Sequence, residues 1–204
     1  ADNANLSASA SGLSPATLAL GGLPARTLVE RFRAASLAVS DGEPVGIWIG
    51  DVNPAVAAMP FSADLPVFRA NATPAGSAAV GFTNNGMLFI PSDLSPMGGA
   101  TNFSLALVFR SLASGTGAGL QWFAQTGIVD ADLAGAHHTD WGLSLDSDGV
   151  LNFGVGAPDY TFPGGSYAVA DAEWHVAVVS CEATSQELRI HVDDLPAAVS
   201  RGSI

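Results

Sequence analysis

The chain has 204 residues and a net charge of −12, with 19 acidic residues against seven arginines and no lysine. This charge excludes nucleic acid as a partner, because nucleic-acid-binding proteins need a basic surface that displaces counterions. Anionic membrane surfaces repel the chain for the same reason, and no apolar stretch of the sequence reaches the roughly 20 residues that span a bilayer, so we expect no membrane insertion.

The composition predicts a folded chain that is stabilised by a hydrophobic core. Hydrophobic residues make up 48% of the sequence and charged residues only 13%, which is the reverse of a disordered composition. Cys181 is the single cysteine, so an internal disulfide is excluded. Because Cys181 follows an apolar run, we expect its side chain to be buried.

The N-terminal third of the chain offers few regular elements. Residues 1–25 are rich in Ser, Ala, Leu and Gly, and we expect a linker or an extended arm there. Residues 28–37 (LVERFRAASL) have apolar residues at helical spacing, which predicts one amphipathic helical turn. Asp41-Gly42 then marks a turn before the apolar run Val45–Ile49.

Short apolar segments separated by turn residues follow from there to the end of the chain. Asn84-Asn85-Gly86 predicts a hairpin turn between the apolar segments Ala78–Phe82 and Met87–Ile90. The later strand candidates are Phe103–Arg110, Trp141–Leu145, Val150–Val155, Trp174–Cys181 and Glu187–Val192. Many short strands and almost no helix predict an all-β fold with two packed antiparallel sheets.

Several of these segments resemble motifs of one family when they are taken in order. They are Val45-Gly46-Ile47-Trp48 with Asp51 behind it, Ala79-Val80-Gly81-Phe82, Trp174-His175-Val176-Ala177, and Ile190-His191-Val192-Asp193. The chain resembles the concanavalin A-like lectin/glucanase superfamily, and within it the bacterial laminin G-like domains, over about residues 28–199. The resemblance implies a two-sheet antiparallel jelly-roll sandwich.

The resemblance also bears on the C-terminal end of the domain. In the family at least one further strand and a closing strand follow the position of Asp193-Asp194, whereas only residues 195–204 remain here. We therefore expect a domain over residues 26–204 that is truncated at its C-terminus. The sheet edge left open would be covered by residues 1–25, by a strand from another chain in an oligomer, or by residues beyond Ile204.

Catalysis is not expected from the carboxylates of this chain. The glucanase branch of the resembled superfamily carries paired carboxylates on one strand, in a pattern like E-x-D-x-x-E, and retaining glycosidases need two carboxyls about 5–5.5 Å apart. None of the five glutamates begins such a pattern. We therefore expect a protein that is not an enzyme.

A ligand site is predicted where aromatic, imidazole and carboxylate groups coincide in the sequence. The candidate residues are Trp122, His137, His138, Asp140 and Trp141. Both tryptophans neighbour polar or glycine-rich loops, so we expect them to form an exposed platform for a sugar, with core packing as the competing use. Laminin G-like relatives often bind calcium at loop ends, and Asp146 and Asp148 are candidate ligands, unless they only shape a hairpin turn.

Two classes of function follow. The first is non-catalytic, lectin-like carbohydrate binding or adhesion, outside the cell or at the surface of a larger particle. The second is a structural module of an extracellular or virion assembly, such as a capsid or tail decoration, that binds protein surfaces. Exposed aromatics ringed by Asp and Asn favour the sugar, whereas a broad apolar patch and a docked N-terminal arm favour assembly.

Overall fold

The computed structural model describes residues 4–8, 16–20, 28–83, 85–115, 121–132, 139–156 and 160–201. In these ranges the chain forms antiparallel strands and two short 3-10 turns, which confirms the expected all-β class. No helix within them is long and apolar enough to cross a membrane. The chain divides into two compact units, a larger one (residues 1–23 and 99–204) and a smaller one (residues 24–98), which are described separately.

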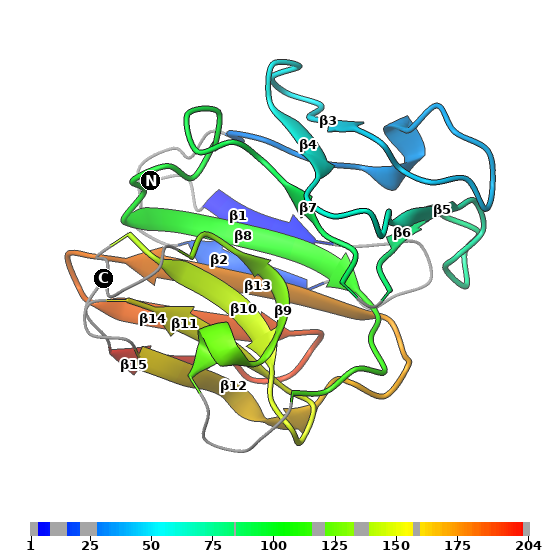
Figure 1. The fold of residues 1–204 in the computed structure, drawn as a ribbon. Helices are drawn as coiled ribbons and strands as arrows, with labels where there is room; N and C mark the ends of the chain where they lie inside the picture. Colours follow the sequence, from blue (N-terminus) through cyan, green and yellow to red (C-terminus); the bar gives the residue numbers. More distant parts are fainter. Residues whose placement is uncertain are drawn as a thin grey trace. The chain divides into compact units, whose positions relative to one another are not determined.

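The larger unit is built from two antiparallel sheets and a hairpin (Figure 1). Its elements are β1 (Ala4–Ala8), β2 (Ala16–Leu20), β8 (Asn102–Phe109), η2 (Trp122–Ala124), β9 (Thr126–Asp130), β10 (Trp141–Leu145), β11 (Val150–Val155), β12 (Tyr160–Ala168), β13 (His175–Glu182), β14 (Glu187–Val192) and β15 (Ala198–Arg201). One sheet has the order β15-β14-β13-β8 and the other β12-β11-β10-β9. The predicted strands Phe103–Arg110, Trp174–Cys181 and Glu187–Val192 are confirmed as β8, β13 and β14.

The two sheets pack face to face through alternating apolar side chains, as in a β-sandwich. The ring of Phe103 on β8 lies 5.0 Å from that of Trp141 on β10 and 6.1 Å from that of Phe153 on β11, measured between centroids. Cys181 pairs with Phe103 across the ladder and is buried, and this burial raises the pKa of its thiol to about 12. The expected buried cysteine is therefore confirmed.

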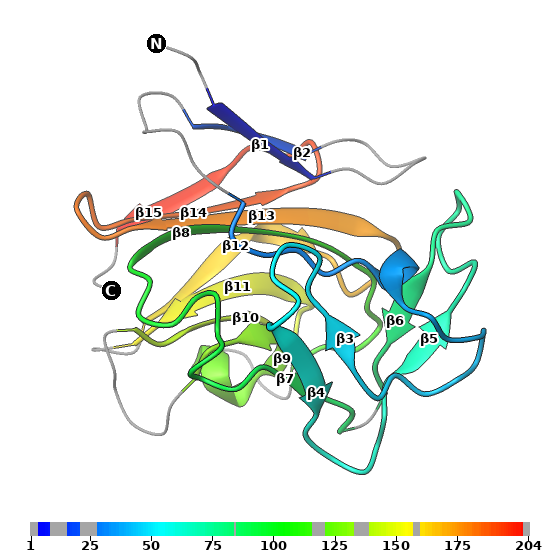
Figure 2. The same cartoon turned by 90° about the horizontal axis from the view of Figure 1, so that it is seen from above.

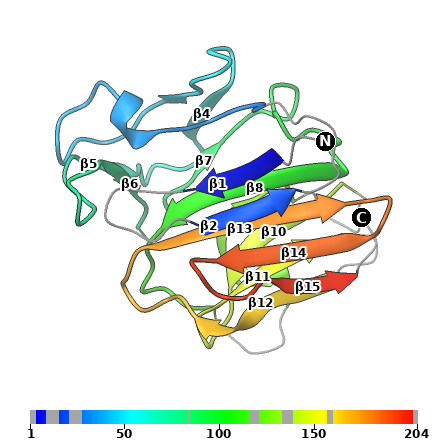
Figure 3. The same cartoon turned by 180° about the vertical axis from the view of Figure 1, so that it is seen from behind.

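A hairpin of β1 and β2 lies over the outer face of the β8–β15 sheet. β1 contacts β8 and β13, and β2 contacts β13 and β14 (Figures 2 and 3). Val176 and Val178 point away from the sandwich core, yet both are fully buried. Residues 4–8 and 16–20 thus form paired strands in the segment expected to be an arm, while the division at residue 25 stays a prediction.

The hairpin turn at Asp146 and Asp148 is present, whereas the hairpin predicted at Asn84-Asn85-Gly86 is not. β10 and β11 pair around Asp146–Gly149, and β13 and β14 pair directly. The hairpin across residues 78–90 is wrong, because its two strands take other partners: β6 (Ala79–Gly81) pairs with β5 (Val67–Arg69), and β7 (Leu88–Phe89) pairs with β4 (Ala57–Pro60).

The smaller unit contains short strands and a 3-10 turn. Besides β4 to β7 it has η1 (Ala34–Ser36) and β3 (Trp48–Ile49), and β3, β4 and β7 form a three-stranded sheet. Of the helical turn expected over residues 28–37, only the 3-10 turn η1 at Ala34–Ser36 is present. The preceding residues 28–33 are not helical, because contacts with residues 51–53 outweigh the local helical pattern.

Candidate functional site

The outer face of the β9–β12 sheet is polar and lined with glycine. On β10 and β11 the side chains of Leu143 and Phe153 point into the core, so their neighbours Gly142 and Gly154 point outward. Gly142 and Gly154 are paired across the ladder. Two facing glycines leave a bare strip of backbone on which a flat ring can lie.

Trp122 occupies this strip. A Cβ atom on Gly154 would lie 1.8 Å from Cγ of Trp122, and one on Gly142 would lie 2.4 Å from Cζ3. The indole therefore lies directly on the glycine pair, and Trp122 is only 2% exposed. Its backbone N–H donates to Oγ1 of Thr161 on β12 at 2.9 Å, which fixes η2 to the sheet.

Amide side chains from the η2 segment extend the polar network along the same face. Oε1 of Gln125 accepts hydrogen bonds from Oγ of Ser144 at 3.0 Å and from Nδ2 of Asn152 at 3.1 Å. Oγ1 of Thr161 donates to Oε1 of Gln121 at 3.1 Å. We call this set of residues, with Trp122, the glycine pair and Asp130, the polar face.

Asp130 lies at the rim of the polar face, where β9 pairs with β10. It is paired with Gly142 and reaches solvent. Protein atoms crowd its carboxyl, and this desolvation raises the pKa of Asp130, although a backbone N–H from Asp132 works against it. The group titrates closer to neutrality than an ordinary Asp.

Asp140 has the least satisfied side chain of the region. It precedes β10, and its carbonyl accepts the N–H of Gly156 at 3.1 Å, which continues the ladder. Asp140 is 1% exposed, and within the part of the chain that the structure describes neither of its carboxylate oxygens has a hydrogen-bond partner. A buried carboxylate without a donor is costly, so this position calls for a bound group that donates hydrogen bonds or carries positive charge.

The structure separates the residues that the sequence grouped into one site. Trp122 lies on the outer side of β10, whereas Trp141 points into the core and is 3% exposed. The expectation that these two indoles form an exposed platform is therefore wrong, because glycines admit one ring to the sheet surface and the core takes the other. His137 and His138 lie outside the described residues.

The other two predicted ligands, Asp146 and Asp148, lie in the turn between β10 and β11. Oδ1 of Asp146 accepts the N–H groups of Asp148 and Val150 at 2.9 Å each, and Oδ2 accepts from Asn152 at 3.3 Å. Asp148 is exposed. Among the described residues no group of three or more His, Cys, Asp or Glu side chains is placed to hold a metal ion.

The sequence interpretation missed Gln121, Gln125, Asn152 and Thr161. The signal available was the alternation of small or polar residues with large apolar ones in Gly142-Leu143-Ser144-Leu145 and Asn152-Phe153-Gly154-Val155. Placed in register, the two alternations give one apolar and one polar side of a sheet. The glutamines carry no such signal because they come from outside the strands.

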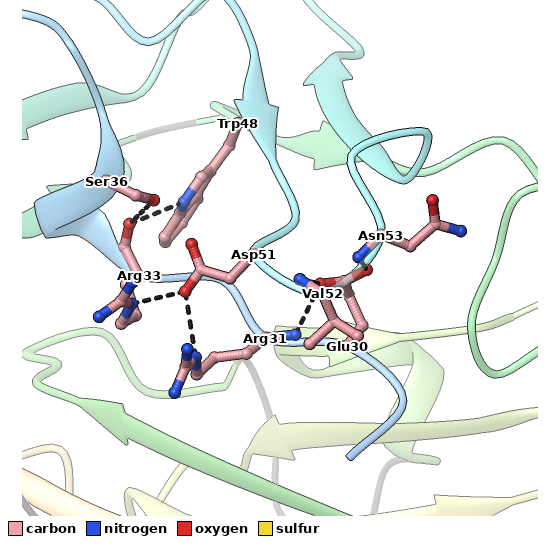
Figure 4. A network of polar contacts seen from close by, with 8 residues as sticks. All are labelled: Glu30, Arg31, Arg33, Ser36, Trp48, Asp51, Val52 and Asn53. Atoms are coloured by element: carbon pink, nitrogen blue, oxygen red, sulfur yellow. Dashed lines mark hydrogen bonds and ion pairs between the residues drawn. The ribbon is translucent and has the colours of Figure 1, made fainter. Parts of the chain in front are cut away.

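A second polar network lies in the smaller unit (Figure 4). The Glu30 carboxylate accepts the backbone N–H groups of Arg31, Val52 and Asn53 at 2.8 to 3.0 Å. Burial works against ionisation, but these three bonds prevail and lower the pKa of Glu30. A Cβ on Gly50 would lie 2.4 Å from the Glu30 carboxyl, so the close approach requires glycine there.

Comparison of the sequence with protein-family models found no matching family, and comparison with curated proteins found no matching relative.

Proposed function

We propose that the chain is a non-catalytic, lectin-like module that binds carbohydrate at the polar face. We further propose a concanavalin A-like jelly roll of the laminin G-like type, located outside the cell or on a particle surface. Support for the family comes from the sandwich-like pair of antiparallel sheets and from the ordered motifs between residues 28 and 199.

The single observation that carries the proposal is the unpartnered carboxylate of Asp140, which lies two residues before Gly142 and by alternation falls on the same side of the sheet as the polar face. Indole Nε1 of Trp122 is also buried without a partner in the described residues. A carboxylate only accepts hydrogen bonds and an indole N–H only donates them. A sugar hydroxyl does both, so a polyhydroxylated ligand matches both kinds of unpaired group, which a simple cation does not.

The rim of the polar face has the residue types that contact sugars. Phe123 is 48% exposed, and its ring packs edge-on against that of Trp122. Gln121 and Asp130 are exposed beside it. An aromatic ring, an amide and a carboxylate together provide an apolar contact and directional hydrogen bonds.

A glycan array, probed with and without calcium, tests the proposal. We expect binding to some glycan, a loss of at least tenfold in affinity for Asp140→Asn, and unchanged affinity for Asp148→Asn, which alters an exposed carboxylate at the opposite end of β10. A calcium requirement for binding would make calcium a cofactor. An array that is blank under both conditions would contradict carbohydrate binding.

A second candidate function, assembly with protein partners, is favoured by an apolar face in the smaller unit and by the N-terminal β1–β2 hairpin that contacts β8, β13 and β14 in the larger unit. In the β3-β4-β7 sheet, Ile49, Met59 and Phe89 fall on one side by register. Phe61 and Met87 continue that side, and Ile47, Ile49, Phe61, Met87 and Phe89 are 38% to 67% exposed. None of these residues is charged, so two copies of this acidic chain can meet here without bringing like charges together.

This candidate predicts self-association through the apolar face. We expect sedimentation of the wild-type chain to show dimers that dissociate when Phe61 and Phe89 are both replaced by Ser. Leu112→Ser is the matched control, because Leu112 is 79% exposed and belongs to the larger unit. A wild-type chain that is monomeric at high concentration would contradict assembly through a second copy.

A further inference from the structure

Arginine is scarce in this protein, and its placement is uneven. The larger unit has 13 acidic residues and three arginines, whereas the smaller unit has six acidic residues and four arginines. Two of those four, Arg31 and Arg33, point to the same carboxylate, that of Asp51. In a chain with seven arginines, this brings two guanidinium groups to one carboxylate.

The contacts fix both guanidinium groups at one atom. Nε of Arg31 lies 3.0 Å from Oδ2 of Asp51, and Nε of Arg33 lies 2.5 Å from the same oxygen. The hydrogen bond from Arg33 is the largest of the effects that lower the pKa of Asp51, and that from Arg31 adds to it. The carboxylate therefore stays ionised and anchors both side chains.

The outer ends of the two arginines remain available. The side chain of Asp51 is 8% exposed, whereas those of Arg31 and Arg33 are 50% and 56% exposed. Each uses only Nε for Asp51, and the described residues offer no partner to the Nη atoms of either. The second acidic residue, Glu30, directs its carboxylate to backbone N–H groups of the turn instead (Figure 4).

We propose that Arg31 and Arg33 form a binding site for an oxyanion, meaning a carboxylate or sulfate group carried by a ligand. Guanidinium groups bind such anions through two parallel N–H donors. Two guanidiniums already held by one carboxylate lose little conformational freedom on binding, which favours affinity. The site goes beyond the proposed polar face, because it lies in the other unit and recognises charge rather than hydroxyl groups.

Titration with sodium sulfate, followed by NMR of the arginine Nε–H signals, tests the site in the full chain. Sodium chloride at equal ionic strength is the reference for screening. We expect saturable shifts at Arg31 and Arg33 that exceed those at Arg69, an exposed arginine of the same unit. Glucuronate compared with glucose shows whether the same site takes a carboxylate attached to a sugar.

Substitutions of Arg33 and Asp51 distinguish a specific sulfate site from nonspecific electrostatic attraction of sulfate. Arg33→Gln should weaken sulfate binding at least tenfold, whereas Arg69→Gln should leave it unchanged. Asp51→Asn removes a negative charge, so simple electrostatics predicts tighter binding, but loss of the anchor predicts weaker binding. Weaker binding in Asp51→Asn, with the amide spectrum of the fold retained, supports the proposal. Tighter binding, or sulfate shifts no larger than those in chloride, overturns it.

Discussion

Nδ1 of His175 lies 2.8 Å from Oδ2 of Asp193, and the other oxygen of that carboxylate accepts the N–H of Val176 at 2.8 Å. Asp193 follows β14 and has a φ of +52°, a left-handed conformation that Asp tolerates better than most residues. On the other side of the ring, Nε2 lies 3.0 Å from Oδ1 of Asp171. The imidazole therefore links the start of β13 to the end of β14.

This arrangement predicts a pH-dependent stability. Burial alone would lower the pKa of His175, but the hydrogen bonds and charges of Asp193 and Asp171 outweigh it and raise the pKa above 6.5. A raised pKa in the folded state stabilises the protein below the unfolded value of 6.5, and this stabilisation is lost as pH rises through the folded pKa. Urea unfolding of the wild type and His175→Gln should differ most at about pH 6 and converge at higher pH.

At acidic pH the contribution of Asp171 to the free energy of unfolding depends on pH in the opposite direction. The hydrogen bond from His175 lowers the pKa of Asp171 below its ordinary 3.8, so its contribution is lost as pH falls through that lowered value. A difference between wild type and His175→Gln that stays constant with pH would contradict a charged imidazolium at this position.

A methyl group on Gly154 should displace Trp122. The Cβ of Gly154→Ala would overlap the indole at 1.8 Å from Cγ, so we expect a loss of about 1–3 kcal/mol in the free energy of unfolding. Gly46→Ala is the control, because nothing lies within 4 Å of its Cβ position. In the double variant Gly154→Ala with Trp122→Ala, the cost of the methyl group should largely disappear, and additive costs would show that the ring does not lie on the pair.

Asp146 should act through hydrogen-bond acceptors rather than through charge. Asn in its place keeps one carbonyl oxygen for the N–H groups of Asp148 and Val150, so Asp146→Asn should unfold close to the wild type. Asp146→Ala leaves these donors without the side-chain oxygen and should cost about 1–2 kcal/mol, measured by thermal unfolding. If calcium raises the melting temperature of the wild type but not of Asp146→Asn, a metal role holds instead.

Val178 points away from the sandwich core, and we expect the β1–β2 hairpin to be what buries it. Val178→Ser buries a hydroxyl where Val178 is fully buried, so we expect a loss of about 2–4 kcal/mol. Val199 lies on the same side of the sheet and is 49% exposed, so Val199→Ser should change stability little. After deletion of residues 1–23 the two substitutions should cost similar amounts, and a cost for Val178→Ser that survives the deletion would show that other residues cover it.

Local sequence patterns predicted many of the strands but few of the residues that come together at the polar face. The alternation in Trp141–Leu145 and Val150–Val155, with Asp and Gly between, predicts a hairpin because register and turn are set within a few residues. The burial of Trp122 could not be predicted in the same way, since Gly142 and Gly154 face each other only after the strands pair. The helical turn over residues 28–37 fails for a related reason: Glu30 and Arg31 find their partners about 20 residues away.

The position of β13 has a consequence for the motions of the larger unit. Both edges of β13 are paired, with β8 and β14, one side faces the sandwich core, and the hairpin lies over the other. Its backbone amides are thus screened from water in every direction, and local opening cannot expose them without separating two layers. Amide hydrogens from Val176 to Cys181 should exchange with deuterium only through global unfolding, whereas those of the edge strands β12 and β15 exchange through local opening.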